Sequence, residues 1–118
     1  MQTIVAVVTD LFFAVKVTDG AKRAGRAVKF AQSLEQALEL ATAKVPVMVV
    51  ADLQCREVDC LELARRIKAD AALATIPLLG FVAHVQEDRK QAALAAGFDK
   101  VVARSTFSDR ARELLAGS

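Results

Sequence analysis

The chain contains neither tryptophan nor tyrosine, and its six aromatic residues are all phenylalanine. Because 54% of its 118 residues are nonetheless hydrophobic, the core must be aliphatic and rich in alanine, which suits helices packed on a sheet. The five glycines form neither a G-x-G-x-x-G nor a P-loop spacing, and no G-x-S-x-G is present. Binding of dinucleotides or flavins and nucleophile-elbow hydrolysis are therefore disfavoured.

Metal-binding and disulfide patterns are also missing. The chain has only two cysteines, Cys55 and Cys60, and a single histidine, His84. This is neither a disulfide framework nor a zinc-binding spacing. Cys60 fits the apolar face of a helix, and we expect Cys55 in a loop.

Long hydrophobic segments and charge runs are absent as well. No apolar run approaches the roughly 20 residues that span a bilayer, and the first residues do not form a signal peptide, so we expect a cytoplasmic protein without membrane contact. Lysine and arginine give a net charge of +2 but are spread along the chain, which argues against a nucleic-acid partner. The length suits one domain over residues 1–118, with no room for an output domain.

Five short apolar runs without polar alternation are typical of strands buried on both faces of a parallel sheet. They cover residues 3–8, 27–31, 47–52, 76–82 and 100–103. The segments between them have the i, i+3, i+4 and i+7 spacing of helices, and two begin with capping boxes at Ser33 and Asp59. One helix is expected over 11–24 and another over 87–96, and the last follows residues 104–106. The alternation predicts an α/β fold with right-handed crossovers.

Polar side chains follow several of these strands, at the edge of a parallel sheet where ligands bind. Asp10 follows the first strand, Asp52 ends the third, Val82 and His84 lie at the fourth, and Arg104 follows the fifth. Two carboxylates facing each other suit Mg²⁺ or an internal ion pair. Position alone leaves open that Asp52 merely caps a turn.

The chain resembles the receiver domains of two-component response regulators over essentially its full length. The resemblance lies in Asp52 at the end of the third strand, in residues 76–84 (IPLLGFVAH) and in residues 96–100 (AGFDK). It implies a doubly wound, flavodoxin-like fold, with helices on both faces of a five-stranded parallel sheet of order 2-1-3-4-5. It also implies that Asp52 is the phosphoacceptor and that Asp10, Asp52 and the backbone carbonyl of Gln54 bind Mg²⁺. The implied partner is a histidine kinase or another signalling protein.

Five positions depart from the family pattern, one of them Ser105, which stands where the family has a proline. Thr9 stands where the family usually has a second acid, and Val82 replaces the hydroxyl that binds the phosphoryl group. Val101 replaces an aromatic residue that usually moves on activation, and Arg104 replaces a lysine. Since a lost hydrogen bond to a charged group costs about 1.5–3 kcal/mol, Val82 should weaken phosphate-driven switching. Arg104 has a planar fork that prefers carboxylates, and we expect it across Asp52 and Asp10, where Mg²⁺ would otherwise lie.

The sequence thus predicts a stand-alone receiver in phosphorelay signalling that acts through protein–protein contacts, as a monomer or weak homodimer. We expect no enzyme activity beyond self-phosphorylation of Asp52 from a kinase or a small phosphodonor. The alternative is a pseudo-receiver that binds its partner regardless of phosphate, with Arg104 paired to the acidic pocket. The residues expected around that pocket are Thr9, Val82, His84 and Arg104, with His84 more typical of a partner surface than of catalysis.

Overall fold

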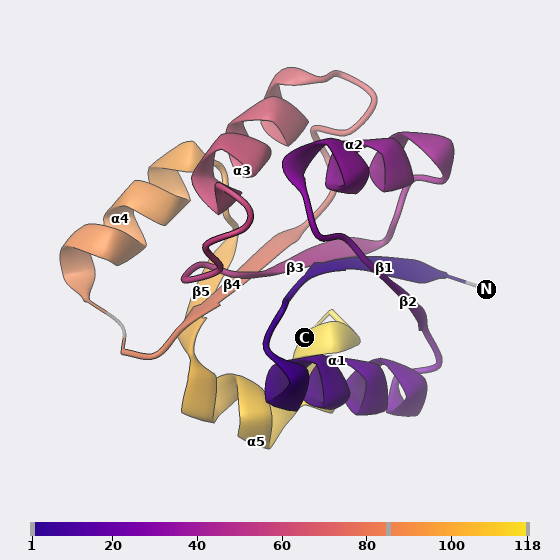
Figure 1. Cartoon of the computed structure of the whole chain (residues 1–118), viewed down its shortest axis with the longest axis vertical. Coiled ribbons are helices and arrows are strands. Elements are labelled where there is room, and N and C mark those ends of the chain that lie inside the picture. The colour runs from indigo at the N-terminus through magenta and orange to yellow at the C-terminus, as the bar shows by residue number, and fades with distance from the viewer. Residues whose placement is uncertain (1, 85, 118) are drawn as a thin grey trace.

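The computed structural model describes residues 2–84 and 86–117. Five parallel strands form one sheet in the order β2-β1-β3-β4-β5. The strands are β1 (Thr3–Val7), β2 (Ala27–Phe30), β3 (Met48–Asp52), β4 (Leu78–Val82) and β5 (Lys100–Ala103). The helices are α1 (Leu11–Arg23), α2 (Leu34–Ala43), α3 (Cys60–Ala69), α4 (Glu87–Ala96) and α5 (Arg104–Leu115). Figure 1 shows α1 and α5 on one face of the sheet and the other three helices on the opposite face. The predicted doubly wound α/β fold and its strand order are confirmed.

Both faces of the sheet are buried, as the unbroken apolar runs predicted. Alternate residues of β1 enter different cores, with Ile4 on the side of α1 and α5 and Val5 on the side of α2, α3 and α4. The edge strand β2 carries the exposed Lys29, as expected of an edge protected by charge. None of the helices within the described residues is long and apolar enough to cross a bilayer.

Two element boundaries differ from expectation by more than one residue. The strand predicted over 76–82 begins at Leu78, because the N–H of Ile76 donates to Leu73 O in the preceding turn and Pro77 has no N–H to give to a neighbouring strand. Helix α5 begins at Arg104, directly after β5, although residues 104–106 were expected to precede it. Arg104 therefore occupies the first turn of a helix at the edge where Asp52 emerges.

Helices α1 and α5 pack closely beneath that edge. A Cβ atom at Gly20 would lie 2.9 Å from the Cβ of Ala111 and 3.1 Å from its backbone carbonyl carbon. Only glycine allows this approach without a shift, because a real Cβ atom essentially never lies 2.9 Å from another one. The later turns of α1 and α5 are thus held against each other on this face of the sheet.

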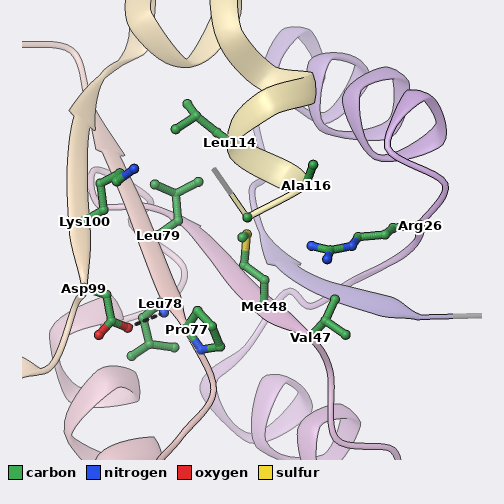
Figure 2. A pocket seen from close by; sticks show the side chains of 11 residues that line it. Arg26, Val47, Met48, Pro77, Leu78, Leu79, Asp99, Lys100, Leu114 and Ala116 are labelled. Carbon is green, nitrogen blue, oxygen red and sulfur yellow. Dashed lines mark hydrogen bonds between the residues drawn. The ribbon is translucent and has the colours of Figure 1, made fainter.

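A cavity of about 450 Å³ opens at the opposite, amino edge of the sheet (Figure 2). Its charged residues hold the fold together. Arg26 donates from Nη1 to the carbonyl of Leu115 at 2.6 Å. Asp99 accepts from the backbone N–H of Leu78 at 2.7 Å and lies 3.6 Å from Lys68 Nζ. These contacts secure the end of α5 and the start of β4, so we assign the cavity a structural role.

Candidate functional site

Asp52 is the last residue of β3, the central strand, and only 3% of its surface is exposed. A buried carboxylate needs partners that replace water. Its Oδ1 accepts from the backbone N–H of Gln54 at 3.0 Å, and its Oδ2 accepts from Nη2 of Arg104 at 2.6 Å. Both oxygens of Asp52 are therefore hydrogen-bonded within the chain.

Arg104 reaches Asp52 across aromatic rings. Its guanidinium carbon lies 4.8 Å from the ring centroid of Phe13 and 6.0 Å from that of Phe81, within the range of cation–π attraction. The side chain is 28% exposed, but its Nε is buried and has no hydrogen-bond partner. Arg104 thus holds Asp52 through one amino group while the rings pack against its charge.

Asp10 is exposed and caps α1. Its Oδ1 accepts from the backbone N–H of Phe12 at 2.9 Å and of Phe13 at 3.2 Å, which satisfies two amide hydrogens that a helix end leaves unpaired. A carboxylate at this end also stabilises the helix dipole. The structure therefore gives Asp10 a structural role whether or not it also binds a metal.

Thr9, where the family usually has an acid, donates its hydroxyl to Oε2 of Glu57 at 3.0 Å. The thiol of Cys55 donates to the same oxygen at 3.2 Å. The pKa of the Glu57 carboxyl is lowered, first by the hydrogen bond from Cys55, then by a backbone N–H and by Thr9, because such bonds favour the charged form. Glu57 therefore adds a negative charge near the site.

The ends of β3 and β4 are joined through Gln54, whose Oε1 accepts from the backbone N–H of Ala83 at 2.7 Å. Val82 is buried and lines a pocket of about 220 Å³ with Leu53, which follows β3, Leu61 of α3 and Arg89 of α4. Most of the side chains around the position of the usual hydroxyl are therefore apolar. His84 is exposed in the loop after β4.

The residues present do not fit a Mg²⁺ ion while Arg104 pairs with Asp52. Magnesium requires oxygen ligands in near-ideal octahedral geometry, but a guanidinium cation holds Oδ2 of Asp52. Asp10 directs one oxygen to the backbone of α1, and Thr9 cannot supply the missing carboxylate. Within residues 2–84 and 86–117, no three His, Cys, Asp or Glu side chains are grouped to hold a metal. We assign no metal to the site in this conformation.

Sequence reasoning singled out Asp52 and Arg104, which the structure brings into contact. It missed the role of Phe13 and Phe81 as partners of Arg104, and it missed Glu57. Phe13 follows Asp10 by three residues in the same helical turn, and Phe81 is the strand partner of Asp52. These two placements could have indicated the rings, whereas nothing in the sequence marked Glu57.

The geometry agrees with the comparison to known families. The family model for the response regulator receiver domain matches residues 5–115. The chain belongs to this family. Receiver domains are generally non-enzymatic modules of two-component signalling that interact with kinases or other signalling proteins, and they typically bind Mg²⁺. This receiver keeps the family fold but places an arginine on the aspartate that ends β3.

Known relatives match the receiver in sequence and in fold. An uncharacterized 14.6 kDa protein in the sodA1 3′ region of Leptolyngbya boryana is 32% identical over 75 residues, which cover 64% of this chain and 57% of that protein. A response regulator from Hahella chejuensis superposes with a TM-score of 0.88 at 16% identity, covering 98% of this chain and 93% of its own. One from Thermotoga maritima superposes with a TM-score of 0.82 at 19% identity, covering 100% and 99% of the two chains. Such low identities show the fold alone.

Proposed function

We propose that this receiver signals through protein–protein contacts in one conformation, held by the Arg104–Asp52 ion pair and independent of phosphate. The contact of 2.6 Å between Arg104 Nη2 and Asp52 Oδ2 carries the proposal. In it, a side chain provides the positive charge that a divalent cation would otherwise bring to the buried carboxylate. Charge-assisted bonds of this kind are short and strong.

The surroundings of the ion pair support the same function. Breaking a largely buried pair by removing one partner typically costs about 3–5 kcal/mol, so Asp52 does not readily give up Arg104. Val82 offers no hydroxyl to a phosphoryl group, and Val101 is a buried aliphatic residue. A ligand shifts a two-state equilibrium only by its differential affinity for the two states. A phosphoryl group would find few such contacts here.

A second candidate function is the phosphoacceptor role itself, favoured by Asp52 at the end of β3 with Asp10 following β1. A histidine kinase or small phosphodonor would then phosphorylate Asp52, and Arg104 would have to leave it. Asp10, Asp52 and the carbonyl of Gln54 would hold Mg²⁺ in that state.

In both candidates we place the protein in the cytoplasm, as a monomer or weak homodimer that binds a histidine kinase or another signalling protein and no nucleic acid. The family commonly uses β4, α4, β5 and α5 for such contacts. The two candidates differ in whether partner binding depends on phosphate and Mg²⁺ at Asp52.

Amide NMR spectra of the ¹⁵N-labelled protein, recorded alone, with Mg²⁺ and with Mg²⁺ plus beryllium fluoride, distinguish the candidates. We expect no saturable shifts at millimolar Mg²⁺ in the wild type. The double variant Thr9→Asp with Arg104→Lys restores the usual family residues at these two positions and should respond around Asp10 and Asp52. Saturable wild-type shifts that extend from Asp52 to β5 would instead support the phosphoacceptor function.

A further inference from the structure

Two aromatic rings from different elements form a platform under the guanidinium of Arg104. Phe13 comes from the first turn of α1 and Phe81 from β4, and their ring centroids lie 5.3 Å apart. Phe81 in turn stacks on Phe107 of α5 at 4.7 Å. We call Phe13 and Phe81 the arginine platform.

We infer that Phe13, through this platform, positions Arg104 and thereby decides whether Asp52 faces an arginine or a divalent cation. The inference rests on the proposed function, since it says which residue controls the same ion pair between Arg104 and Asp52. The ring of Phe13 is the nearer of the two, at 4.8 Å from the guanidinium carbon. It is attracted to the arginine through its negative face and shields it from water.

The unpartnered Nε of Arg104 explains why a ring is needed. A fully bidentate pair with a carboxylate would use two donors of the guanidinium fork, whereas here Nε is buried without any acceptor. The hydrogen bond to Asp52 alone leaves that donor unsatisfied, and water could satisfy it if the side chain turned outward. The ring of Phe13 compensates for this loss and keeps Arg104 over Asp52.

Phe13 is the member of the platform that can be altered without destroying the core. Phe81 is fully buried and stacked on a second buried ring, so its truncation would strongly destabilise the protein. Phe13 is only half-buried, and its backbone N–H donates to Asp10 at 3.2 Å. The helical turn that carries the acid therefore also carries the ring that holds the competing arginine.

The inference predicts that Phe13→Leu gives Asp52 an affinity for divalent cations without any added acid. Mn²⁺ is the probe, because its paramagnetism broadens the amide signals of residues beside the bound ion. The loss of a partly buried cation–π contact should tighten the apparent Kd for Mn²⁺ about tenfold relative to the wild type. Phe12→Leu is the matched control, since Phe12 is adjacent and 59% exposed, and its ring meets that of Phe13 edge-on at 5.0 Å without being part of the platform.

A second readout follows Arg104 itself. Its buried Nε–H should give a signal protected from solvent exchange and shifted by the ring current of Phe13. We expect this signal to be unchanged in Phe12→Leu and to lose its shift in Phe13→Leu, while the amide spectrum shows both variants to be folded. Phe13→Met, which nearly conserves volume, replaces Phe13→Leu if the latter is unfolded.

Arg104→Gln separates this inference from the proposed function. Tighter Mn²⁺ binding in both Arg104→Gln and Phe13→Leu supports both. Tighter binding in Arg104→Gln alone, with Phe13→Leu equal to Phe12→Leu, would overturn the role of Phe13 but leave the ion pair as the barrier to metal. Wild-type binding as tight as that of Arg104→Gln would overturn the proposed function, and no binding in any variant would overturn the inference.

Discussion

Val82 removes from the end of β4 the hydroxyl that usually binds the phosphoryl group in this family. Its side chain is 4% exposed and lines the same pocket as Leu53 and Leu61. A hydroxyl at this position would lie mainly among apolar side chains, and a buried hydroxyl without a partner is unfavourable. The valine is therefore adapted to its present neighbours.

We predict that Val82→Thr lowers the free energy of unfolding by about 1–3 kcal/mol, which is the cost of an unsatisfied buried hydroxyl. Urea denaturation followed by circular dichroism measures this change. Val15→Thr makes the same replacement at a position that is 65% exposed on α1, and it should change stability by no more than about 0.5 kcal/mol. Equal effects at the two positions would contradict the explanation.

At the level of single residues, the sequence predicted that Asp52 and Arg104 would pair, but it did not predict the aromatic rings that surround them. Asp52 and Arg104 each follow a predicted parallel strand, and such strand ends meet at one edge of a sheet. The arginine platform depends on the direction of Phe13 from α1 toward Phe81 in β4. No periodicity in the sequence encodes that direction, because it is set by packing between distant elements.

The first turn of α1 combines two tasks within four residues. Asp10 closes the turn through the N–H groups of Phe12 and Phe13, and Phe13 supports Arg104. Substitutions that loosen this turn should therefore also weaken the contact between Arg104 and Asp52. Substitution of Asp10 can separate the effect of its capping hydrogen bonds from the effect of its negative charge.

We predict that Asp10→Ala destabilises the protein by about 1 kcal/mol, whereas Asp10→Asn keeps most of the stability because asparagine also caps helices. Thermal unfolding of the two variants tests this difference. Asp10→Asn removes the carboxylate but retains an oxygen that can accept from Phe12 and Phe13. If both variants lost the same stability, the charge of Asp10 would matter more than its hydrogen bonds.

Most helices and strands could be predicted from sequence, and the two boundary errors of more than one residue have local causes. Helix α2 begins at the expected Ser33, whose side chain accepts from the N–H of Gln36. Helix α5 follows Ala103, which offers no side-chain cap, so its start carried no capping signal. The apolar run predicted as the fourth strand includes Ile76 and Pro77, which precede the first residue of β4.

On the scale of the whole molecule, Cys60 links the pH of the solution to global stability. It begins α3, lies in the core and donates its thiol to the backbone carbonyl of Asp52 at 3.4 Å. Burial raises the pKa of the Cys60 thiol from 9.0 to about 12, with smaller contributions from Cys55, Asp52 and Asp59. The folded protein therefore keeps this thiol protonated where the unfolded chain would ionise it.

We predict that the free energy of unfolding falls as the pH rises from 9 to about 12. Below pH 9 the thiol is protonated in both states and favours neither, whereas above it the unfolded state alone releases the proton. The slope from this group is at most about 1.4 kcal/mol per pH unit. Chemical denaturation at several pH values should show this fall in the wild type and less of it in Cys60→Ala.

Cys55→Ala is the control, because burial and not Cys55 is the main cause of the raised pKa of Cys60, so most of the wild-type pH dependence of stability should remain in this variant. A Cys60→Ala variant with the full wild-type slope would contradict the assignment to Cys60. Other groups titrate in this range too, so the comparison uses the difference between variants at each pH.

The overall architecture was the most predictable property of the molecule. Alternating strand and helix patterns indicated a parallel sheet with crossovers, and the resemblance to receiver domains supplied the order of its strands. Local patterns could not supply the 2.6 Å contact between Arg104 and Asp52, which joins residues 52 positions apart in the chain. That contact depends on the register of β3, β4 and β5 and on the start of α5.

The ion pair between Arg104 and Asp52 bears on how such a protein would carry information over time. A phosphorylated aspartate decays by hydrolysis, so an ordinary receiver reports recent kinase activity and then resets. A cation built into the polypeptide cannot be hydrolysed or washed away. Under the proposed function, the strength of the signal would follow the number of copies that the cell makes and degrades, and the memory of the signal would last as long as the protein itself.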